Sequence, residues 1–244
     1  MEIMKSFTKR KNEFIKKVMI RSTFLMASAF AVLTPESVFA KPHEIQKAPA
    51  DSVATAKDIF SKLHCSALEI LPLSTRLDML DYWAVDSVYK ASNAMEGLSW
   101  LEKVSDNYLK VRVTSVSTLE IKILPIKNGH LILTINTLGD DVQAQDSHVK
   151  FYDMNLFELP TDKHFVMPEV KDFFEIPKGS ATKMKEIEEM IPFPTIALSA
   201  NPDNDNLKAW LTVEKYINED DWNIAKLFLK PSIVLNWKKE KYKY

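Results

Sequence analysis

The acids with the clearest helical spacing are Asp78 and Asp81, within the stretch LPLSTRLDMLDYW at residues 71–83. Residues three apart on a helix share one face, so the two carboxylates would lie one turn apart. Two carboxylates can act as general acid and general base when burial or proximity makes them titrate differently. An outward helix face provides neither condition, and Thr75 with Asp78 fits a helix-capping box. We therefore expect a capped helix with its acids in solvent, and keep Asp78 and Asp81 as candidates for catalysis.

A second group of acids lies in the segment GDDVQAQDSH at residues 139–148. It contributes Asp140, Asp141 and Asp146, which are the candidate binding residues. A loop of this kind can bind a cation or a protein partner, although most acidic loops are only solvated. The five histidines show no metal-ligand spacing. We expect neither a metal site nor a cofactor.

Glycine and cysteine usage excludes several classes of site. The chain has four glycines, none within six residues of another, so it contains no phosphate-cradling loop and no dinucleotide-binding turn. Cys65 is the single cysteine, so no internal disulfide can form. Helical projection places Cys65 on an outer face, where its thiol should react with thiol reagents; whether it forms an intermolecular disulfide stays open.

The first forty residues are typical of a secretory signal peptide. A basic segment is followed by an apolar run at residues 23–33, and Val38 and Ala40 are small enough for a signal peptidase, which predicts cleavage before Lys41. A bilayer span needs ~20 apolar residues, about twice this run. We therefore expect a periplasmic or otherwise exported protein with no transmembrane span in the mature chain.

The charge of the mature chain argues against a polyanionic partner. The full chain has 32 Lys+Arg and 33 Asp+Glu, and residues 1–40 contain seven and three of these, which leaves a mature net charge of about −5. A negative protein repels nucleic acid. We expect no nucleic-acid partner, and look instead to another envelope protein or a surface component.

Two helices are predicted before the strands begin. Residues 41–57 are polar and without period, and we expect a flexible lead-in there. From Asp58 to Leu71 the apolar residues follow a helical period, and Pro72 ends this helix. In the next helix, the side chains predicted to face the core are Leu77, Leu80, Trp83 and Ala84.

From Tyr108 to Asp153 the hydrophobic period falls to two, which predicts about four antiparallel strands with one buried face. The hairpin at Lys127-Asn128-Gly129 can be placed in register. A three-residue loop pairs Ile123 with Leu133 and keeps the apolar residues on one face, whereas a two-residue Asn-Gly loop mixes the faces. We therefore predict the three-residue loop.

The remaining chain predicts a smaller half with the same plan. A helix at residues 180–191 precedes a hairpin at 195–213, and Asn218 caps a helix with three acids in its first turn, followed by a last strand at 232–237. Strand runs separated from helices indicate an α+β fold. We expect an antiparallel meander sheet with packed helices and a second, smaller helix-plus-hairpin half.

This pattern predicts one α+β domain over residues 58–244, with possible subdomains at 58–160 and 161–244.

Three segments resemble a family of exported bacterial proteins, known mainly from Bacteroidetes and described only as a domain of unknown function. They are LPLSTRLDMLDY, STLEIKILPIKNG and QAQDSHVKFYD. The resemblance covers the chain from about Ala67 onward. It implies export in a Gram-negative envelope and a single architecture, and it brings no activity, ligand or catalytic residue with it.

Two hypotheses of function follow. The first is a non-enzymatic envelope protein with a binding or assembly role, acting through its sheet surface and acidic loop. The alternative is a periplasmic hydrolase that uses scattered carboxylates, with Asp78 and Asp81 as its best candidates.

Overall fold

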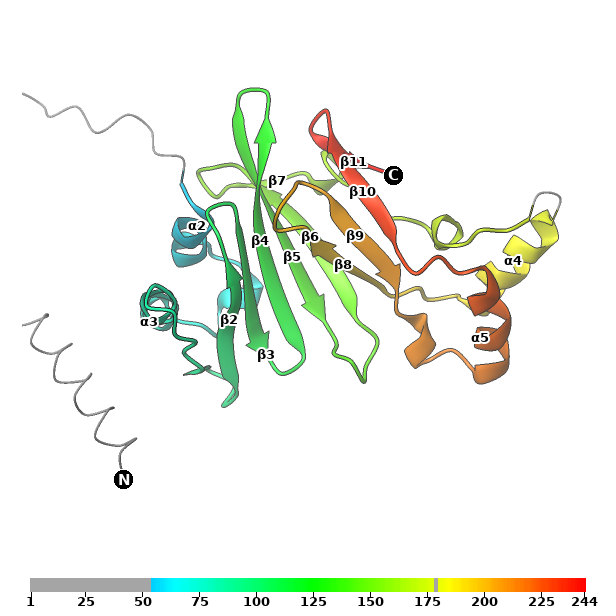
Figure 1. The fold of residues 1–244 in the computed structure, drawn as a ribbon, viewed down its shortest axis with the longest axis horizontal. Coiled ribbons are helices and arrows are strands. Elements are labelled where there is room, and N and C mark those ends of the chain that lie inside the picture. Colours follow the sequence, from blue (N-terminus) through cyan, green and yellow to red (C-terminus); the bar gives the residue numbers. More distant parts are fainter. Residues whose placement is uncertain (1–53, 178–179) are drawn as a thin grey trace, which may run out of the picture. The chain divides into compact units, whose positions relative to one another are not determined.

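Two antiparallel sheets form the centre of the described chain, which comprises residues 54–177 and 180–244 of a computed structural model (Figure 1). In the larger sheet, seven strands follow one another in sequence order as a meander. They are β1 (Ala91–Ser92), β2 (Leu98–Val104), β3 (Tyr108–Thr114), β4 (Ser117–Ile126), β5 (Gly129–Leu138), β6 (Asp146–Tyr152) and β7 (Glu158–Leu159). The smaller sheet has the order β11-β10-β9-β8. Its strands are β8 (Ile196–Ala200), β9 (Leu207–Leu211), β10 (Ile233–Lys238) and β11 (Lys241–Lys243).

The helices are segregated from the strand runs. The α-helices are α2 (Ala56–Lys62), α3 (Leu73–Trp83), α4 (Ala181–Met190) and α5 (Glu219–Ala225). The 3-10 turns are η1 (Ser66–Leu68), η2 (Thr161–Lys163), η3 (Val170–Phe173), η4 (Val213–Lys215) and η5 (Lys226–Phe228). The predicted α+β class, with its meander and its smaller helix-plus-hairpin half, is confirmed. The predicted signal peptide lies outside the described residues, and among those described no helix is long and apolar enough to span a bilayer.

The larger sheet is buried on both faces, which corrects the prediction of one buried face. On one face α2, η1 and α3 bury Phe60, Leu63 and Met79 against Leu119 and Ile121. On the other face the smaller sheet packs against a different set of strand residues, namely Leu124, Leu133, Ile135 and Phe151. Every residue of β4 from Ser117 to Leu124 is therefore buried. Each large apolar side chain removed from water contributes about 1.5–3 kcal/mol, so both faces stabilise the fold.

The predicted register of the β4–β5 hairpin is wrong by one residue. Ile123 pairs with Ile132 instead of Leu133, and Ile126 pairs with Gly129, which leaves a two-residue loop. The prediction assumed that only one face holds apolar residues. Because Leu133 belongs to the opposite core, burial on both faces removes that constraint. Gly129, the first residue of β5, has a positive φ of 123°.

The first predicted helix is broken into two short pieces. Thr55 caps α2 through a capping box with Asp58, α2 ends at Lys62, and η1 follows after Cys65. Cys65 is consequently the residue that precedes η1, and it packs partly buried against the core beneath α2. The prediction that its thiol projects from an exposed helix face is wrong. Burial raises the pKa of the Cys65 thiol.

Helix α3 is rotated relative to the prediction because it buries an arginine. Its inward positions are Arg76, 5% exposed, and Met79, whereas Leu77 is 44% exposed. The Arg76 guanidinium donates hydrogen bonds to the carbonyl oxygens of Phe60 (2.6 Å) and Leu63 (2.9 Å), at the C-terminal end of α2. That end of a helix carries unpaired carbonyls and partial negative charge, so it accepts a buried cation.

The predicted capping box at Thr75 and Asp78 is also wrong. Helix α3 begins at Leu73, after Pro72, so both residues lie within the helix, and no side chain caps its first turn.

Strand β8, the edge of the smaller sheet, has its backbone covered by side chains of the larger sheet. The N–H groups of Ile196, Leu198 and Ala200 alternate along one edge. They donate to Asp146 Oδ1 (3.2 Å), Ser147 Oγ (2.9 Å) and Glu120 Oε2 (2.8 Å), respectively. A buried N–H without an acceptor costs free energy, so these three side chains replace a neighbouring strand.

Two further elements show where local patterns succeed and fail. Helix α5 begins as predicted, with Asn218 accepting a hydrogen bond from the N–H of Asp221. Strand β2 was not predicted, because a bulge between Leu101 and Lys103 interrupts its alternation.

Candidate functional site

Asp78 and Asp81 lie exposed on α3, on the outward side of the helix. Their neighbour Arg76 is turned inward and bonds to α2. The structure therefore brings no basic partner from this segment to either carboxylate. A pair of catalytic acids needs two carboxylates in different surroundings. Asp78 and Asp81 are both exposed, so burial does not distinguish them.

The acidic loop that joins β5 to β6 is held in one conformation by its own backbone. Asp140 Oδ1 accepts hydrogen bonds from the N–H groups of Val142 (2.8 Å) and Gln143 (2.7 Å). These two bonds, with smaller contributions from Lys215 and Arg112, hold the pKa of Asp140 below its usual value. The Asp140 carboxylate is thus committed to the turn.

Gly139 allows this loop to close. Its φ is +102°, and a Cβ there would lie 2.3 Å from the carbonyl oxygen of Ala144. A side chain cannot fit in that gap, and the positive φ disfavours any residue but glycine. The close approach of residues 139 and 144 therefore requires glycine at position 139.

The three candidate acids of the loop separate into two roles. Asp140 and Asp141 line a hollow, whereas Asp146 is the first residue of β6 and accepts the N–H of Ile196 on β8. Asp146 therefore joins the two sheets and is not among the lining residues.

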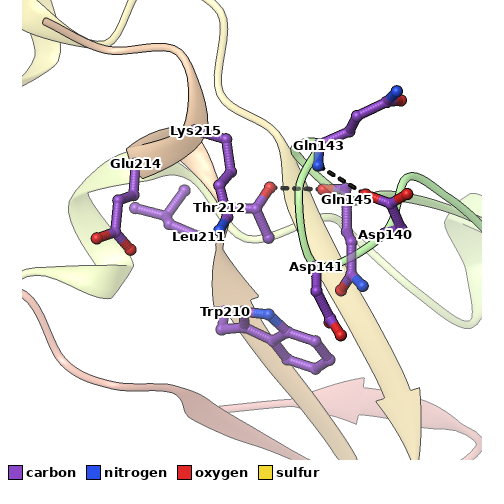
Figure 2. A pocket seen from close by; sticks show the side chains of 9 residues that line it. All are labelled: Asp140, Asp141, Gln143, Gln145, Trp210, Leu211, Thr212, Glu214 and Lys215. Carbon is purple, nitrogen blue, oxygen red and sulfur yellow. Dashed lines mark hydrogen bonds between the residues drawn. The ribbon is translucent and has the colours of Figure 1, made fainter.

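The hollow lies between the acidic loop and the end of β9 with η4, and has a volume of about 380 Å³ (Figure 2). We call it the Trp210 hollow. Its lining residues are Asp140, Asp141, Gln143, Gln145, Trp210, Leu211, Thr212, Glu214 and Lys215. Thr212 Oγ1 donates to the Gln145 carbonyl oxygen at 2.6 Å and lies 2.8 Å from Thr195 Oγ1. These contacts fix the two walls relative to each other.

Trp210 is the one aromatic residue of the lining. It lies half-buried on the face of β9 that points away from the core, two residues from Lys208, whose ammonium is 5.7 Å from the ring centroid. The residue paired with it on β8 is the small Ala197. Figure 2 shows the Asp141 carboxylate and the Gln145 amide turned toward the ring. A flat apolar surface is thus bordered by hydrogen-bonding groups.

A row of alternating charges crosses the larger sheet. Arg112 Nε lies 2.9 Å from Glu102, and Lys110 lies 3.6 Å from both Glu102 and Glu120. Glu120 is 3% exposed and also accepts from Ser199 and Ala200 of β8. Burial raises the pKa of Glu120.

The predicted sheet with one buried face would leave Glu120 and Lys122 outward, since they alternate with the apolar residues of β4, and this consequence is wrong. Lys122 is 1% exposed, and its ammonium lies 3.3 Å from the Pro202 carbonyl oxygen and 3.9 Å from Asp205. Because the smaller sheet covers this face, both charges end between the sheets, where they find partners on β8 and the turn that follows it.

A comparison with family models identifies the chain. The model described as "Protein of unknown function (DUF3256)" matches residues 50–242. The chain belongs to this family.

A solved structure agrees with the fold of this DUF3256 chain. A domain of an uncharacterized protein from Porphyromonas gingivalis W83 is similar over 78% of this chain and 98% of that one, at 22% identity and a TM-score of 0.65. At this identity the likeness shows the fold alone. No curated protein matches the chain. The resemblance to a Bacteroidetes family of unknown function is confirmed.

In the described part of the DUF3256 chain no group of three or more His, Cys, Asp or Glu side chains could hold a metal ion. The chemistry that the hollow offers is recognition through an aromatic ring, two amides, carboxylates and one ammonium.

Sequence reasoning found Asp140 and Asp141 but missed Trp210, Thr212 and Lys215. One signal was available, because Trp210 occupies the polar side of an alternating strand whose inward residues are Leu207, Ala209 and Leu211.

Proposed function

We propose that this DUF3256 chain is an exported protein of the bacterial envelope that binds a component of the cell surface in the Trp210 hollow and catalyses no reaction. Export is supported by the basic and apolar N-terminal segment with its small residues before Lys41. The binding role is supported by the geometry of the hollow.

One observation carries the proposal. The acidic loop and the end of β9 are about 70 residues apart in the sequence, yet they meet around one partly buried tryptophan. Asp140 and Gly139 shape one wall, and Thr212 ties it to the other. A site that is built before its ligand arrives loses little conformational entropy on binding. Its volume falls at the low end of small-molecule sites, roughly 300–1,000 Å³.

The lining is suited to recognition more than to reaction. The nine lining residues include no serine, cysteine or histidine. The Thr212 hydroxyl donates to Gln145, and the Asp140 carboxylate accepts from the loop backbone, so both are already engaged. The free groups, among them Asp141 and Lys215, can form hydrogen bonds to a bound molecule.

No observation favours the alternative, a hydrolase in which Asp78 and Asp81 act. Both carboxylates are exposed on α3, and α3 packs on the face of the larger sheet opposite the smaller sheet.

Export is tested by mass spectrometry of the protein recovered from the envelope and the medium at native expression. The mature chain should begin at Lys41. A chain that keeps residues 1–40 in the cytoplasm would contradict the proposal.

Binding is tested by fluorine NMR of protein labelled with 5-fluorotryptophan, which gives one signal for each of the five tryptophans. The Trp210→Phe variant assigns the signal of Trp210 by its loss. Envelope extract should shift or broaden that signal while leaving the signal of Trp100, which is also half-buried on a strand beside a lysine, unchanged. If no extract fraction changes the Trp210 signal, the binding function is wrong.

A further inference from the structure

We infer that the ligand of the Trp210 hollow is a neutral carbohydrate. The inference rests on the proposed function, because it names the chemical class of the molecule bound at the same site. Three properties of the hollow carry it: its charge balance, its flat aromatic surface, and the kind of hydrogen-bonding groups around that surface.

The hollow and its surroundings carry charges of both signs. Three acids and one lysine line it. Lys215 and Arg112 both lie close enough to Asp140 to stabilise its charged form, and Lys208 lies beside the Trp210 ring. A site for an ionic ligand would present an excess of the opposite charge. Here a charged ligand would meet both signs, so a neutral one fits better.

The Trp210 ring gives the hollow a flat apolar surface. A pyranose has one face of C–H groups that carry partial positive charge, and the face of an indole ring is negative. The two surfaces attract when they stack. Trp210 is only partly buried, so part of its side chain stays accessible to a ligand, while the Lys208 ammonium lies over the ring at 5.7 Å from its centroid.

The polar groups around the ring can form hydrogen bonds with the hydroxyl groups at the edge of a sugar ring. Each sugar hydroxyl donates one hydrogen bond and accepts others. The Asp141 carboxylate only accepts, the Lys215 ammonium only donates, and the Gln145 amide does both. These three side chains come from both walls of the hollow (Figure 2). Neighbouring hydroxyls can therefore each find a complementary partner, whereas an apolar ligand would leave these groups unpaired.

The test uses free neutral sugars as probes: glucose, galactose, mannose, xylose and N-acetylglucosamine. Each is titrated into the 5-fluorotryptophan-labelled chain, and binding is measured in parallel by calorimetry. At least one sugar should shift the Trp210 signal and leave that of Trp100 unchanged. Hexalysine and heparin serve as cationic and anionic probes.

Variants separate the site from the fold. Trp210→Ala should weaken sugar binding by at least about tenfold, which is about 1.4 kcal/mol, and Asp141→Asn should weaken it severalfold. Trp100→Ala and Asp78→Asn, on other surfaces, should bind as the wild type does. If Trp210→Ala does not fold by circular dichroism, Asp141→Asn decides the result.

Each outcome has a distinct meaning. If extract shifts the Trp210 signal but none of the sugars does, the carbohydrate inference is overturned and the binding function stands. The same holds if only hexalysine or heparin shifts it, since the ligand is then ionic. If neither extract nor sugar shifts it, both proposals fall. Sugar binding that survives in Trp210→Ala and in Asp141→Asn also overturns the inference, because the sugar then lies elsewhere.

Discussion

Glu120 provides the sharpest test of how the two sheets are joined. Its carboxylate accepts from the Ala200 N–H at 2.8 Å and from the Ser199 hydroxyl at 3.0 Å, and lies 3.6 Å from the Lys110 ammonium. The substitution Glu120→Ala removes all three contacts at once. Because Ala200 is buried, water does not replace the lost acceptor.

The expected cost can be built up from these contacts. An unpaired buried N–H costs about 1–3 kcal/mol, and loss of the Ser199 bond about 0.5–1.5 kcal/mol. The removed Cγ methylene adds about 0.8 kcal/mol. Lys110 is partly exposed, so its ion pair adds little. We therefore expect Glu120→Ala to lower the free energy of unfolding by roughly 2–5 kcal/mol.

Urea unfolding at pH 7, followed by circular dichroism, measures this loss. Glu102→Ala is the matched control, because Glu102 contacts Lys110 and Arg112 but no buried backbone group. It should cost at most about 1 kcal/mol. If Glu120→Ala is as stable as the wild type, the cost of burying the carboxylate cancels its hydrogen bonds, and our account of the β8 edge is refuted.

Four other predictions follow from single contacts. Since burial raises the pKa of Glu120 above its ordinary 4.5, the folded state holds the proton longer than the unfolded state. Urea unfolding from pH 4.5 upward should show that the wild type loses stability relative to Glu120→Gln, because the carboxyl must ionise in the folded state. The opposite trend would mean that folding favours the charged carboxylate of Glu120 over the protonated acid. Arg76→Met should cost about 1–3 kcal/mol by urea unfolding, since carbonyls of α2 lose their donor; equal stability would mean that the guanidinium is not needed there. Cys65 should react with a thiol reagent much more slowly in the folded than in the unfolded chain, and equal rates would contradict its partial burial. Gly139→Ala should lower the melting temperature more than Gly129→Ala, because a Cβ at Gly139 would meet the Ala144 backbone whereas Gly129 has open space; equal shifts would place the loop differently.

Much of the fold was predictable because local signals agree with it. The capped start of α5 and the β8–β9 hairpin follow from Asn218, its three acids and two alternating segments. The signals failed where tertiary contacts override pattern. Arg76 takes an inward position because α2 offers carbonyls there, and Glu120 is buried because another sheet covers it. Neither partner can be located from local periodicity.

Only one wall of the candidate site, the acidic loop, could be predicted from the sequence. Asp140 and Asp141 stand out as an acidic loop, but nothing near them in the sequence indicates Trp210. The two walls meet because β8 lies beside β6, where Asp146 and Ser147 bond to its edge. The hollow is therefore a product of sheet packing, which a pattern within one segment does not contain.

The covered edge of β8 also has a consequence for pairing between molecules. An uncovered edge strand is a template on which a second molecule can add a strand and begin to aggregate. Asp146, Ser147 and Glu120 occupy the donors that such a strand would use. Substitutions at these positions should therefore do more than loosen the fold. They would also expose backbone donors of β8 on which a strand of a second molecule could pair.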